Sequence, residues 1–398
     1  MNDLTREAPA LAARKDPALA ALKEDARRAV AEAAPILTGL SQQLYEHPET
    51  AWHEVDSARA VGDVLEAAGF AVEREYLGLP TALRAMAGTG AFRVGLMAEY
   101  DALPGLGHAC GHNLISAMSV GAGLALARVA DAAGLTVEVY GTPAEEGGGG
   151  KVELLDRGAF AGLDLALMAH PAPVDIAEAA PFAVAHWHVE YTGKTAHAAA
   201  YPTQAVNAAD AFTIAQVALG LLRQQLPADV RVHGIVTDAG TAPNAIPGRS
   251  AGRWYVRAAS LAQLDELIPR VMACFEAGAL ATGCTLEVTP ESKPYAEFRT
   301  DREALAAYVA NATALGRTFV TEGPATTMAT ASTDMGNVSQ LVRAIHPYIG
   351  VGSFPVSNHQ REFADHCVGP VAEQTLLDGA TALAWTVLDV AAATDVRG

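Results

Sequence analysis

The stretch FRVGLMAEYDALPGLGHACGH, residues 92–112, decides how this chain is interpreted. Its first half is apolar over residues 94–97 and is typical of a buried β-strand. Its second half ends in Cys110-Gly-His112, a thiol and an imidazole two residues apart. A turn that leaves a strand points its side chains into the crevice at the carboxyl end of the sheet, so both groups can reach one metal ion. The stretch therefore predicts an α/β fold with a metal site at one rim of its sheet.

Two further apolar strands are followed by groups of compatible chemistry. Residues 135–140 precede Glu145-Glu146, and residues 163–168 precede His170. Taken singly, a buried cysteine is usually a small hydrophobic residue, and a glutamate pair is usually a solvated helix face. At the ends of three successive strands these residues converge on one rim, which packing alone does not explain. One glutamate can then bind metal while its neighbour transfers protons.

The composition bounds the class of protein. The chain has 398 residues, 51% hydrophobic and 18% charged, which is more than one core usually organises. Its net charge of −18 argues against nucleic acid as a partner, because phosphates would repel such a surface. Residues 1–16 lack the apolar segment of an export signal, and no unbroken run of about twenty apolar residues predicts a membrane span. Four cysteines without a paired motif suit a reducing compartment, so we expect a cytoplasmic protein.

The order of elements changes twice along the chain. Helical periodicity over 17–68, broken at His47-Pro48, gives way to alternating strands and helices up to residue 171. From 182 to 290 the order becomes β-α-β-β-α-β, which is typical of a ferredoxin-like domain. We therefore predict an α/β catalytic domain, with a helix-covered, mixed but largely parallel sheet, formed by 1–181 and 291–398. Residues 182–290 are predicted to be inserted as a lid and dimerisation domain.

Periodicity also places the individual elements. In the catalytic domain it predicts strands at 92–100, 135–140, 163–168 and 345–351, and helices at 114–133, 151–160, 301–315 and 371–391. In the inserted domain it predicts strands at 182–191, 230–236, 253–258 and 285–288, and helices at 204–225 and 261–280.

Two familiar motifs are rejected. Residues 147–151 resemble a phosphate-binding loop, yet the first glycine of that motif is missing and Val152 stands where Ser or Thr must hold magnesium. His53-Glu54 does not begin a zinc-binding helix motif, because Ser57 occupies the place of the second histidine. Neither Glu54 nor Lys151 therefore receives a role from the sequence.

Six motifs, in order and nearly end to end, resemble the M20 metallopeptidase family. They are Tyr100-Asp-Ala-Leu-Pro, His108-Ala-Cys-Gly-His, Thr142-Pro-Ala-Glu-Glu-Gly, Gly193-Lys-Thr-Ala-His, Ala242-Pro-Asn-Ala-Ile-Pro and a late His359. The family includes aminoacylases, carboxypeptidase G and indole-acetyl-amino-acid hydrolases, and the Cys-Gly-His form indicates its cysteine-ligand branch. The segments at 141–151 and 331–337 are similar, more narrowly, to the p-aminobenzoyl-glutamate hydrolase and β-alanyl-dipeptidase group.

The resemblance implies two divalent metal ions per subunit. Zinc suits the ligands best, and manganese, cobalt and nickel are also compatible with them. Glu145 becomes the general base, and Asp101 orients a ligand imidazole, with a helix or turn cap as the alternative for Asp101. The resemblance implies that the Cys110 thiolate bridges both ions. His112 and His170 would complete the ligands of one ion, and Glu146 and His359 those of the other.

The resemblance also implies residues that bind the substrate. His197 would stabilise the oxyanion, often in the neighbouring subunit, and Asn244 would hold the polar end of the substrate, although Asn in such a loop is often only a turn residue. Lys293 stands where the family often has an arginine for a substrate carboxylate, and it offers a point charge without a bidentate fork. Glu99 replaces a metal-binding histidine of the broader family; His112 takes that role and Glu99 stays a candidate weak ligand. The segment at 331–337 adds three candidate substrate-binding residues, which are Ser332, Thr333 and Asp334.

These features imply a metal-dependent amidohydrolase that cleaves a small N-acyl amino acid or dipeptide and works as a homodimer. The alternative is a protein that keeps the fold and binds a small molecule or peptide without turnover. Glu145 beside a full ligand set favours the enzyme, because a binding protein needs no proton shuttle. A peptidase of long chains is disfavoured, because a lid leaves little room for a polypeptide. We expect neither nucleic acid nor a membrane as partner.

Overall fold

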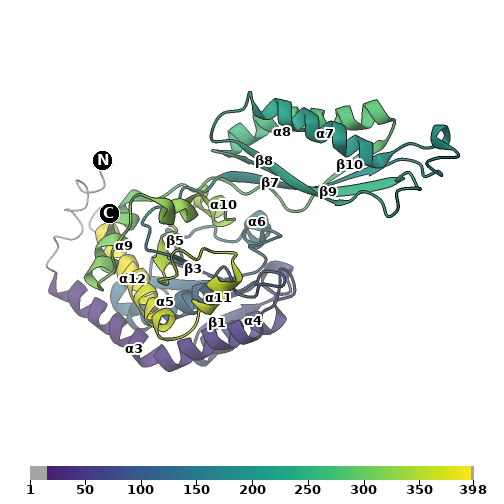
Figure 1. Ribbon diagram of the computed structural model, residues 1–398. Coiled ribbons are helices and arrows are strands. Elements are labelled where there is room, and N and C mark those ends of the chain that lie inside the picture. Colours follow the sequence, from purple (N-terminus) through teal and green to yellow (C-terminus); the bar gives the residue numbers. More distant parts are fainter. Residues whose placement is uncertain (1–15, 396–398) are drawn as a thin grey trace. The chain divides into compact units, whose positions relative to one another are not determined.

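The computed structural model describes residues 16–395 and divides them into two compact units (Figure 1). One unit holds the described residues up to Ala180 together with those from Phe298 onward, and the other holds Pro181–Glu297. The predicted insertion ends at residue 290, whereas the second unit continues to Glu297, because Tyr295 and Val184 exchange two backbone hydrogen bonds of 3.0 Å. Residues 1–15, for which the sequence predicts no export signal, lie outside the described residues.

The first unit is built on a six-stranded mixed sheet. Its strands lie in the order β1 (Ala71–Arg74), β2 (Leu83–Ala87), β4 (Leu135–Thr142), β3 (Phe92–Glu99), β5 (Leu165–Leu167) and β11 (Ala344–Ile345). The last four are parallel to one another, whereas β2 pairs antiparallel with both β1 and β4. All residues of β4 and nearly all of β3 are buried, as expected for a sheet covered on both faces. The predicted helix-covered, largely parallel sheet is confirmed.

Alternate residues of the central strands enter two separate cores. On β3, Val94 and Leu96 join the larger core, whereas Met97 joins the smaller one together with Tyr140 of β4. The larger core is covered by α3 (Pro17–Glu46), α4 (Val55–Ala67), α5 (His112–Ala133), α9 (Arg302–Ala314), α11 (Arg361–Asp365) and α12 (Pro370–Asp395). The smaller core is covered by η1 (Tyr76–Gly78), α6 (Gly150–Asp156) and α10 (Met335–Ser339). The short helix η3 (Pro324–Thr330) packs against a small separate cluster.

Two of the described helices, α5 and α12, are long and apolar enough to cross a membrane by length and composition alone. In the structure, 83% and 72% of their most apolar windows are buried. A helix that is buried in a core needs no polar face, so this burial accounts for their composition.

The neighbouring parallel strands β5 and β11 are each followed by a short gap and then by a second strand. Strand β6 (His170–Ala172) follows β5 after two residues and pairs with β12 (Tyr348–Gly350), which follows β11 in the same way. The sequence predicts one strand over 345–351, but Pro347 in its middle has no N–H to donate to a neighbouring strand. The helix predicted over 151–160 also ends early, because the chain turns at Gly158 with φ of 90°.

The second unit has an antiparallel sheet with two helices packed on one face (Figure 1). Its elements are β7 (Ala183–Thr192), η2 (Pro202–Gln204), α7 (Ala208–Arg223), β8 (Arg231–Asp238), β9 (Arg249–Ala258), α8 (Leu261–Thr282) and β10 (Thr285–Pro290). Apart from the short η2, this is the β-α-β-β-α-β order that the sequence predicts, and the strands lie in the order β10-β7-β9-β8. On β7, Trp187 and Val189 face the helices, whereas His186 and His188 are half-buried on the other face. Strands β8 and β10 form the two edges of this sheet.

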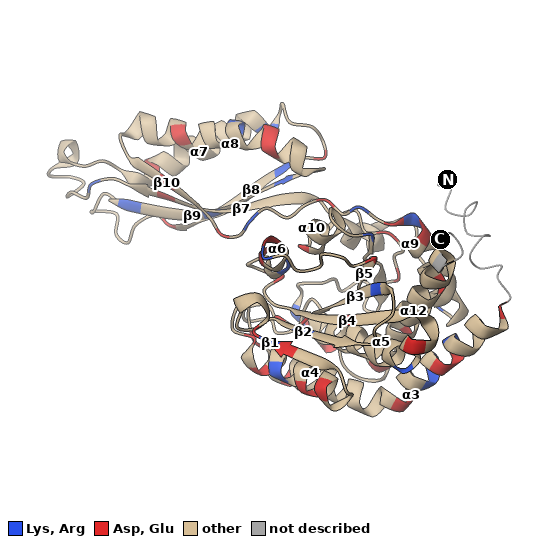
Figure 2. Ribbon diagram, turned by 180° about the vertical axis from the view of Figure 1, so that it is seen from behind, with Lys and Arg blue, Asp and Glu red and all other residues tan. Residues whose placement is uncertain are grey.

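Exposed side chains of both positive and negative charge lie along the outer helices of the first unit. Figure 2 shows Lys and Arg beside Asp and Glu along α3 and α4. On α3, Arg27 lies 2.6 Å from Glu24 and Arg28 lies 2.5 Å from Asp25. Because such exposed pairs contribute little to stability, the buried charges of this unit say more about function.

Candidate metal centre

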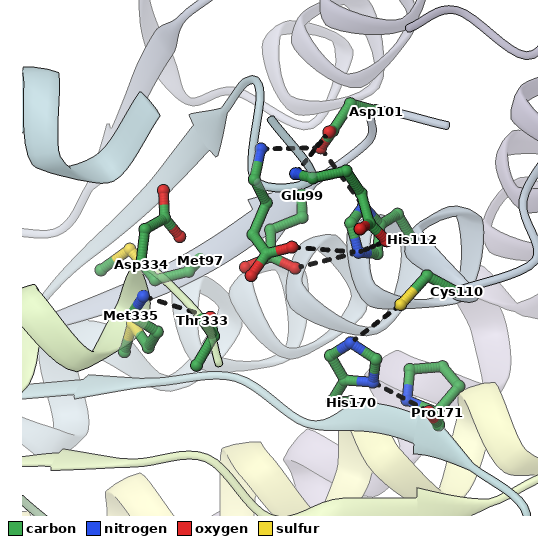
Figure 3. Close-up of polar contacts among 12 residues, drawn as sticks. Met97, Glu99, Asp101, Cys110, His112, His170, Pro171, Thr333, Asp334 and Met335 are labelled. Carbon is green, nitrogen blue, oxygen red and sulfur yellow. Dashed lines mark hydrogen bonds and ion pairs between the residues drawn. The ribbon is translucent and has the colours of Figure 1, made fainter. Parts of the chain in front are cut away.

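The loops at the carboxyl ends of the parallel strands form one site (Figure 3). Strand β3 leads to Asp101 and then to the Cys110 turn before α5, and β4 leads to the glutamate pair. The backbone N–H of His359 donates to the carbonyl of Ala109 at 2.8 Å, which brings this late histidine beside the Cys110 turn. The site unites all the residues that the resemblance implies as ligands: Cys110, His112, Glu146, His170 and His359.

The ligand atoms fall into two groups that share one thiol. In each group, the atoms lie within 4.8 Å of one another. The groups are Cys110 with His112 and His170, and Cys110 with Glu146 and His359. Thiol, imidazole and carboxylate at this spacing suit zinc and related divalent ions. The division of the ligands matches the one that the resemblance implies. A third group consists of Glu99, His112 and Glu145.

Both buried imidazoles present the same nitrogen to the site. The Nδ1 of His170 donates to the carbonyl of Pro171 at 2.8 Å, which leaves Nε2 facing the Cys110 thiol at 3.6 Å. The Nδ1 of His112 lies 3.2 Å from Asp101 Oδ1, and its Nε2 is buried without a hydrogen-bond partner among the described residues. The Nε2 atoms of His112 and His170, which belong to the ligand groups, are therefore the ones that would bind a metal ion.

Gly111 is required between the two ligands of the Cys-Gly-His turn. Its φ of 85° is in the left-handed region, which favours glycine. A Cβ at this position would lie 2.8 Å from the ring of Pro171, the residue next to His170. The turn can therefore approach β6 closely enough to bring Cys110 and His170 together only with glycine at this position.

Asp101 holds three parts of the site at once. Its Oδ1 accepts a hydrogen bond from the N–H of Glu145 at 3.1 Å, and its Oδ2 accepts one from the N–H of Glu146 at 2.9 Å. Burial alone would lower the pKa of His112, but the hydrogen bond to Asp101 raises it to about 10. Asp101 thus orients the imidazole of His112 and also positions the glutamate pair.

The two adjacent glutamates differ in their affinity for protons. Burial raises the pKa of Glu145 well above its usual value, and the charges of Glu99 and Glu146 add to this effect. Burial acts in the same direction on Glu146, but the hydrogen bond with His359 lowers the pKa of Glu146 to about 2. Two neighbouring carboxyl groups with pKa values driven apart are suited to different tasks, one as proton carrier and one as anionic ligand.

Burial also shifts the pKa values of two ligands of the first group, the Cys110 thiol and the His170 imidazole. Burial raises the pKa of the Cys110 thiol well above its usual value, with a further contribution from Glu146 and Glu145. Burial lowers the pKa of His170 to about 3, so its ring is neutral at pH 7. Neutral imidazole is the form that binds metal, whereas the thiol must lose its proton, which metal binding itself promotes.

Lys151, to which the sequence assigns no role, is a buried cation at this site. Its Nζ lies 2.5 Å from Glu99 Oε1 and 2.6 Å from Asp334 Oδ1, and all three side chains are fully buried. The glycines before it allow tight packing, because a Cβ at Gly150 would lie 1.9 Å from the carbonyl oxygen of Pro143. Four glycines and a lysine directly after the glutamate pair are the signal that could have revealed it.

Glu54 is a second residue without a predicted role, and it supports the glutamate loop. Its Oε1 accepts a hydrogen bond from the N–H of Ala144 at 2.8 Å. Ala144 has φ of 57°, a left-handed conformation that is uncommon for residues other than glycine. Burial raises the pKa of Glu54 to about 7, and Asp101 adds to the effect. The segment rejected as a zinc-binding helix thus contributes a residue that holds the turn before Glu145.

Three of the predicted substrate-binding residues lie in the first unit, before α10. Asp334 accepts hydrogen bonds from the Nζ of Lys151 at 2.6 Å and from its backbone N–H at 2.9 Å. The Oγ1 of Thr333 accepts one from the N–H of Met335 at 3.2 Å (Figure 3). Ser332 is half-buried. These bonds of Thr333 and Asp334 are internal to the fold, and substrate binding by this segment stays a prediction.

The other predicted substrate-binding residues, His197, Asn244 and Lys293, are exposed in the second unit. The Nδ1 of His197 accepts hydrogen bonds from two following backbone N–H groups at 3.3 and 3.2 Å, so its proton is on Nε2. The N–H of Ala198 donates to the carbonyl of Asn244 at 2.9 Å, which holds the loops of His197 and Asn244 side by side. The predicted metal ligands all belong to the first unit, and the roles of these three residues stay predictions.

Comparison with known proteins agrees with the resemblance noted in the sequence. The model of peptidase family M20/M25/M40 matches residues 95–388. The Xaa-Arg dipeptidase of Mus musculus is 41% identical over 379 residues, covering 91% of this chain and 87% of the relative. One of the subunits of the p-aminobenzoyl-glutamate hydrolase of Escherichia coli is 32% identical over 271 residues, covering 63% of this chain and 56% of the relative.

A solved structure shares the fold over most of both chains. It is a dinuclear metal-binding peptidase of the M20 family from Bacillus subtilis, with a TM-score of 0.59, 20% identity, and coverage of 87% of this chain and 97% of that chain. This likeness is one of fold, whereas the family match and the extent of the sequence similarity lead to one conclusion about family and activity. The chain belongs to peptidase family M20/M25/M40 and is a metal-dependent hydrolase of peptide or amide bonds.

Proposed function

We propose that the protein is a dinuclear metallohydrolase that cleaves the amide bond of a dipeptide or small N-acyl amino acid. The observation that carries the proposal is the pair of ligand groups that share Cys110. Thiolate, imidazole and carboxylate ligands of this kind would favour zinc, with manganese, cobalt and nickel as alternatives. The solved relative from Bacillus subtilis is described as dinuclear, which supports the same count of ions for this chain.

In this proposal the chain supplies proton transfer and orientation. Two divalent ions bound at the shared thiol would polarise the substrate carbonyl and make a water molecule more acidic. Glu145 takes a proton from the attacking water and passes it to the leaving amine, which suits its raised pKa. Asp101 keeps Glu145 and Glu146 in place through their backbone N–H groups.

Relatives that match most of the chain favour dipeptides as substrates. The mouse relative, 41% identical, is named for dipeptides that end in arginine. The bacterial relative, named for p-aminobenzoyl-glutamate, is 32% identical and matches less of the chain. Dipeptides with arginine at the carboxyl end are therefore the first substrates to test.

A substrate panel with metal-loaded and metal-free protein tests this function. We expect release of free arginine from Xaa-Arg dipeptides, with kcat/KM about tenfold or more above that for p-aminobenzoyl-glutamate. N-acetyl-arginine is the matched control, since it keeps the arginine and removes the free amino group. Cleavage of neither dipeptides nor N-acyl amino acids by protein that contains two ions would contradict the proposal.

We also propose that the second unit joins two subunits. Its sheet has free edges at β8 and β10, and an exposed edge favours pairing with another chain. Val217 and Leu221 on α7 and Ile235 on β8 are more than half exposed. A homodimer that covers these side chains, with the same surface used by both copies, is the simplest symmetric arrangement.

Mixing two inactive variants tests whether His197 serves the neighbouring subunit. Glu145→Gln and His197→Ala subunits are each expected to be inactive, and their mixture is expected to regain part of the activity. The reason is that a heterodimer contains one site in which both residues are intact. Subunit exchange must be verified with tagged chains; no recovery after exchange, or a fully active monomer, would refute catalysis across the interface.

A further inference from the structure

Lys151 is a cation held entirely inside the first unit. Its Nζ is 2.5 Å from Glu99 Oε1 and 2.6 Å from Asp334 Oδ1, and its backbone N–H donates to Asp334 Oδ2 at 2.9 Å. Lysine is almost never fully buried unless it is paired, because an isolated charge is strongly disfavoured inside a protein. Burial alone would lower the pKa of Lys151, but Asp334 and Glu99 raise it above its usual value. The ammonium group therefore stays charged.

Glu99 belongs to a set of side chains that could hold a divalent metal ion. Its Oε2 is 3.6 Å from His112 Nε2, and the two groups form a ligand set with Glu145. His112 Nε2 is also part of the set with Cys110 and His170. It is buried and has no hydrogen-bond partner among the described residues, so either set could use it. Something must decide which of the two sets receives the ion.

The other oxygen of Glu99 is the one that contacts Lys151. A divalent ion bound at Glu99 would lie beside the ammonium group, and repulsion between like charges is strong where water is excluded. The Nζ of Lys151 lies against this carboxylate, and both side chains are fully buried. Glu99 is thus an anion whose charge is already balanced from within the chain.

We propose that Lys151 is a resident cation that keeps a divalent ion out of the group of Glu99, His112 and Glu145 and so confines metal binding to the two groups that share Cys110. The lysine pairs with Glu99 and Asp334, so His112 Nε2 is left for the group with Cys110 and His170. The inference rests on the proposed function only in assuming that those two groups hold the ions.

Titration of the metal-free protein with cobalt(II) tests this role without measuring activity. Bound cobalt is counted by elemental analysis after desalting, and absorption from thiolate-to-cobalt charge transfer reports ions on Cys110. We expect two ions per chain in the unchanged protein and in Lys151→Met, but the thiolate absorption of Lys151→Met should fall to about half, because one ion leaves Cys110. An ion bound by Glu99, His112 and Glu145 gives no such absorption, because these residues contribute no sulfur.

Two further variants identify the site of the relocated ion and guard against misfolding. Lys151→Met combined with Glu99→Gln should regain the full thiolate absorption, because the carboxylate that received the ion is gone. Lys151→Met combined with Asp334→Asn removes one buried negative charge together with the positive one, and it should show the weakened absorption even if Lys151→Met alone does not fold. Circular dichroism and a cooperative thermal transition establish folding in each case.

Glu99→Gln in the chain that keeps Lys151 provides a test that needs no loss of the lysine. Lys151 then remains paired with Asp334, and we expect two ions with unchanged affinity. Loss of an ion from Glu99→Gln would show that Glu99 is itself a ligand and would overturn the inference. Full thiolate absorption in a folded lysine variant would also overturn it. Fewer than two ions in the unchanged protein would instead count against the proposed function.

Discussion

Replacing Glu145 by glutamine is expected to lower turnover about 100-fold or more, the usual scale of general acid–base catalysis, while the metal content stays unchanged. Glutamine keeps the shape of the side chain but cannot carry the proton between water and leaving amine. The backbone N–H of residue 145 still donates to Asp101, so the loop should keep its conformation. The measurements are kcat and KM for the best dipeptide, with elemental analysis of the same preparation.

Glu146→Gln is the matched control for this experiment. The change is chemically identical and one residue away, but Glu146 belongs to the group with Cys110 and His359. We expect this variant to lose metal, and activity should return in part when excess metal is added. If Glu145→Gln lost metal and Glu146→Gln kept it, the two roles would be reversed. Near-normal turnover in Glu145→Gln would mean that another group carries the proton.

Cys110→Ser is expected to lose at least one ion per chain and most of the activity with it. Cys110 is common to both sulfur-containing ligand groups, so its loss affects both at once. A serine hydroxyl is a much poorer ligand than a thiolate, because zinc and related ions prefer the softer sulfur. Elemental analysis and the thiolate-to-cobalt absorption of the cobalt-loaded protein should both decrease.

Cys284→Ser makes the same chemical change away from the ligand groups. Cys284 is half-buried in the second unit, just before β10, and belongs to none of the ligand groups found among the described residues. Its replacement should leave metal content and activity as they were. Undiminished metal in Cys110→Ser would refute the shared thiolate, and full activity after exhaustive chelation would refute a metal requirement.

Several features of the fold could be read from local sequence. Apolar runs predict strands near 92–100 and 135–140, and the structure has β3 and β4 there, because a strand buried on both faces must be apolar throughout. The order β-α-β-β-α-β follows in the same way from alternating periodicities. The meeting of Cys110, the glutamate pair and His170 was also predictable, because parallel strands end at the same rim and each of these follows such a strand. His359 was assigned only through the family resemblance, and its hydrogen bond to Ala109 brings it to the site.

Other features depend on which distant segments meet. Lys151 lies in a segment that resembles a phosphate-binding loop but lacks required residues of that motif. Its partner Asp334 lies 183 residues away in the chain. Glu54 contacts Ala144, 90 residues away, and neither periodicity nor motif spacing predicts that bond. The strand expected over 345–351 is divided because its two halves pair with different strands, β5 and β6.

The sequence by itself determined the main buried strands and helices and the kinds of residue that can bind metal, because these depend on side-chain chemistry and short-range periodicity. Only the tertiary structure decided how the buried charges are balanced. A carboxylate inside a protein needs a partner, but its sequence position does not say which cation or N–H group will lie within hydrogen-bond distance after packing. That choice pairs Glu99 with Lys151 rather than leaving it to a metal ion, and it makes Asp101 the support of both glutamates.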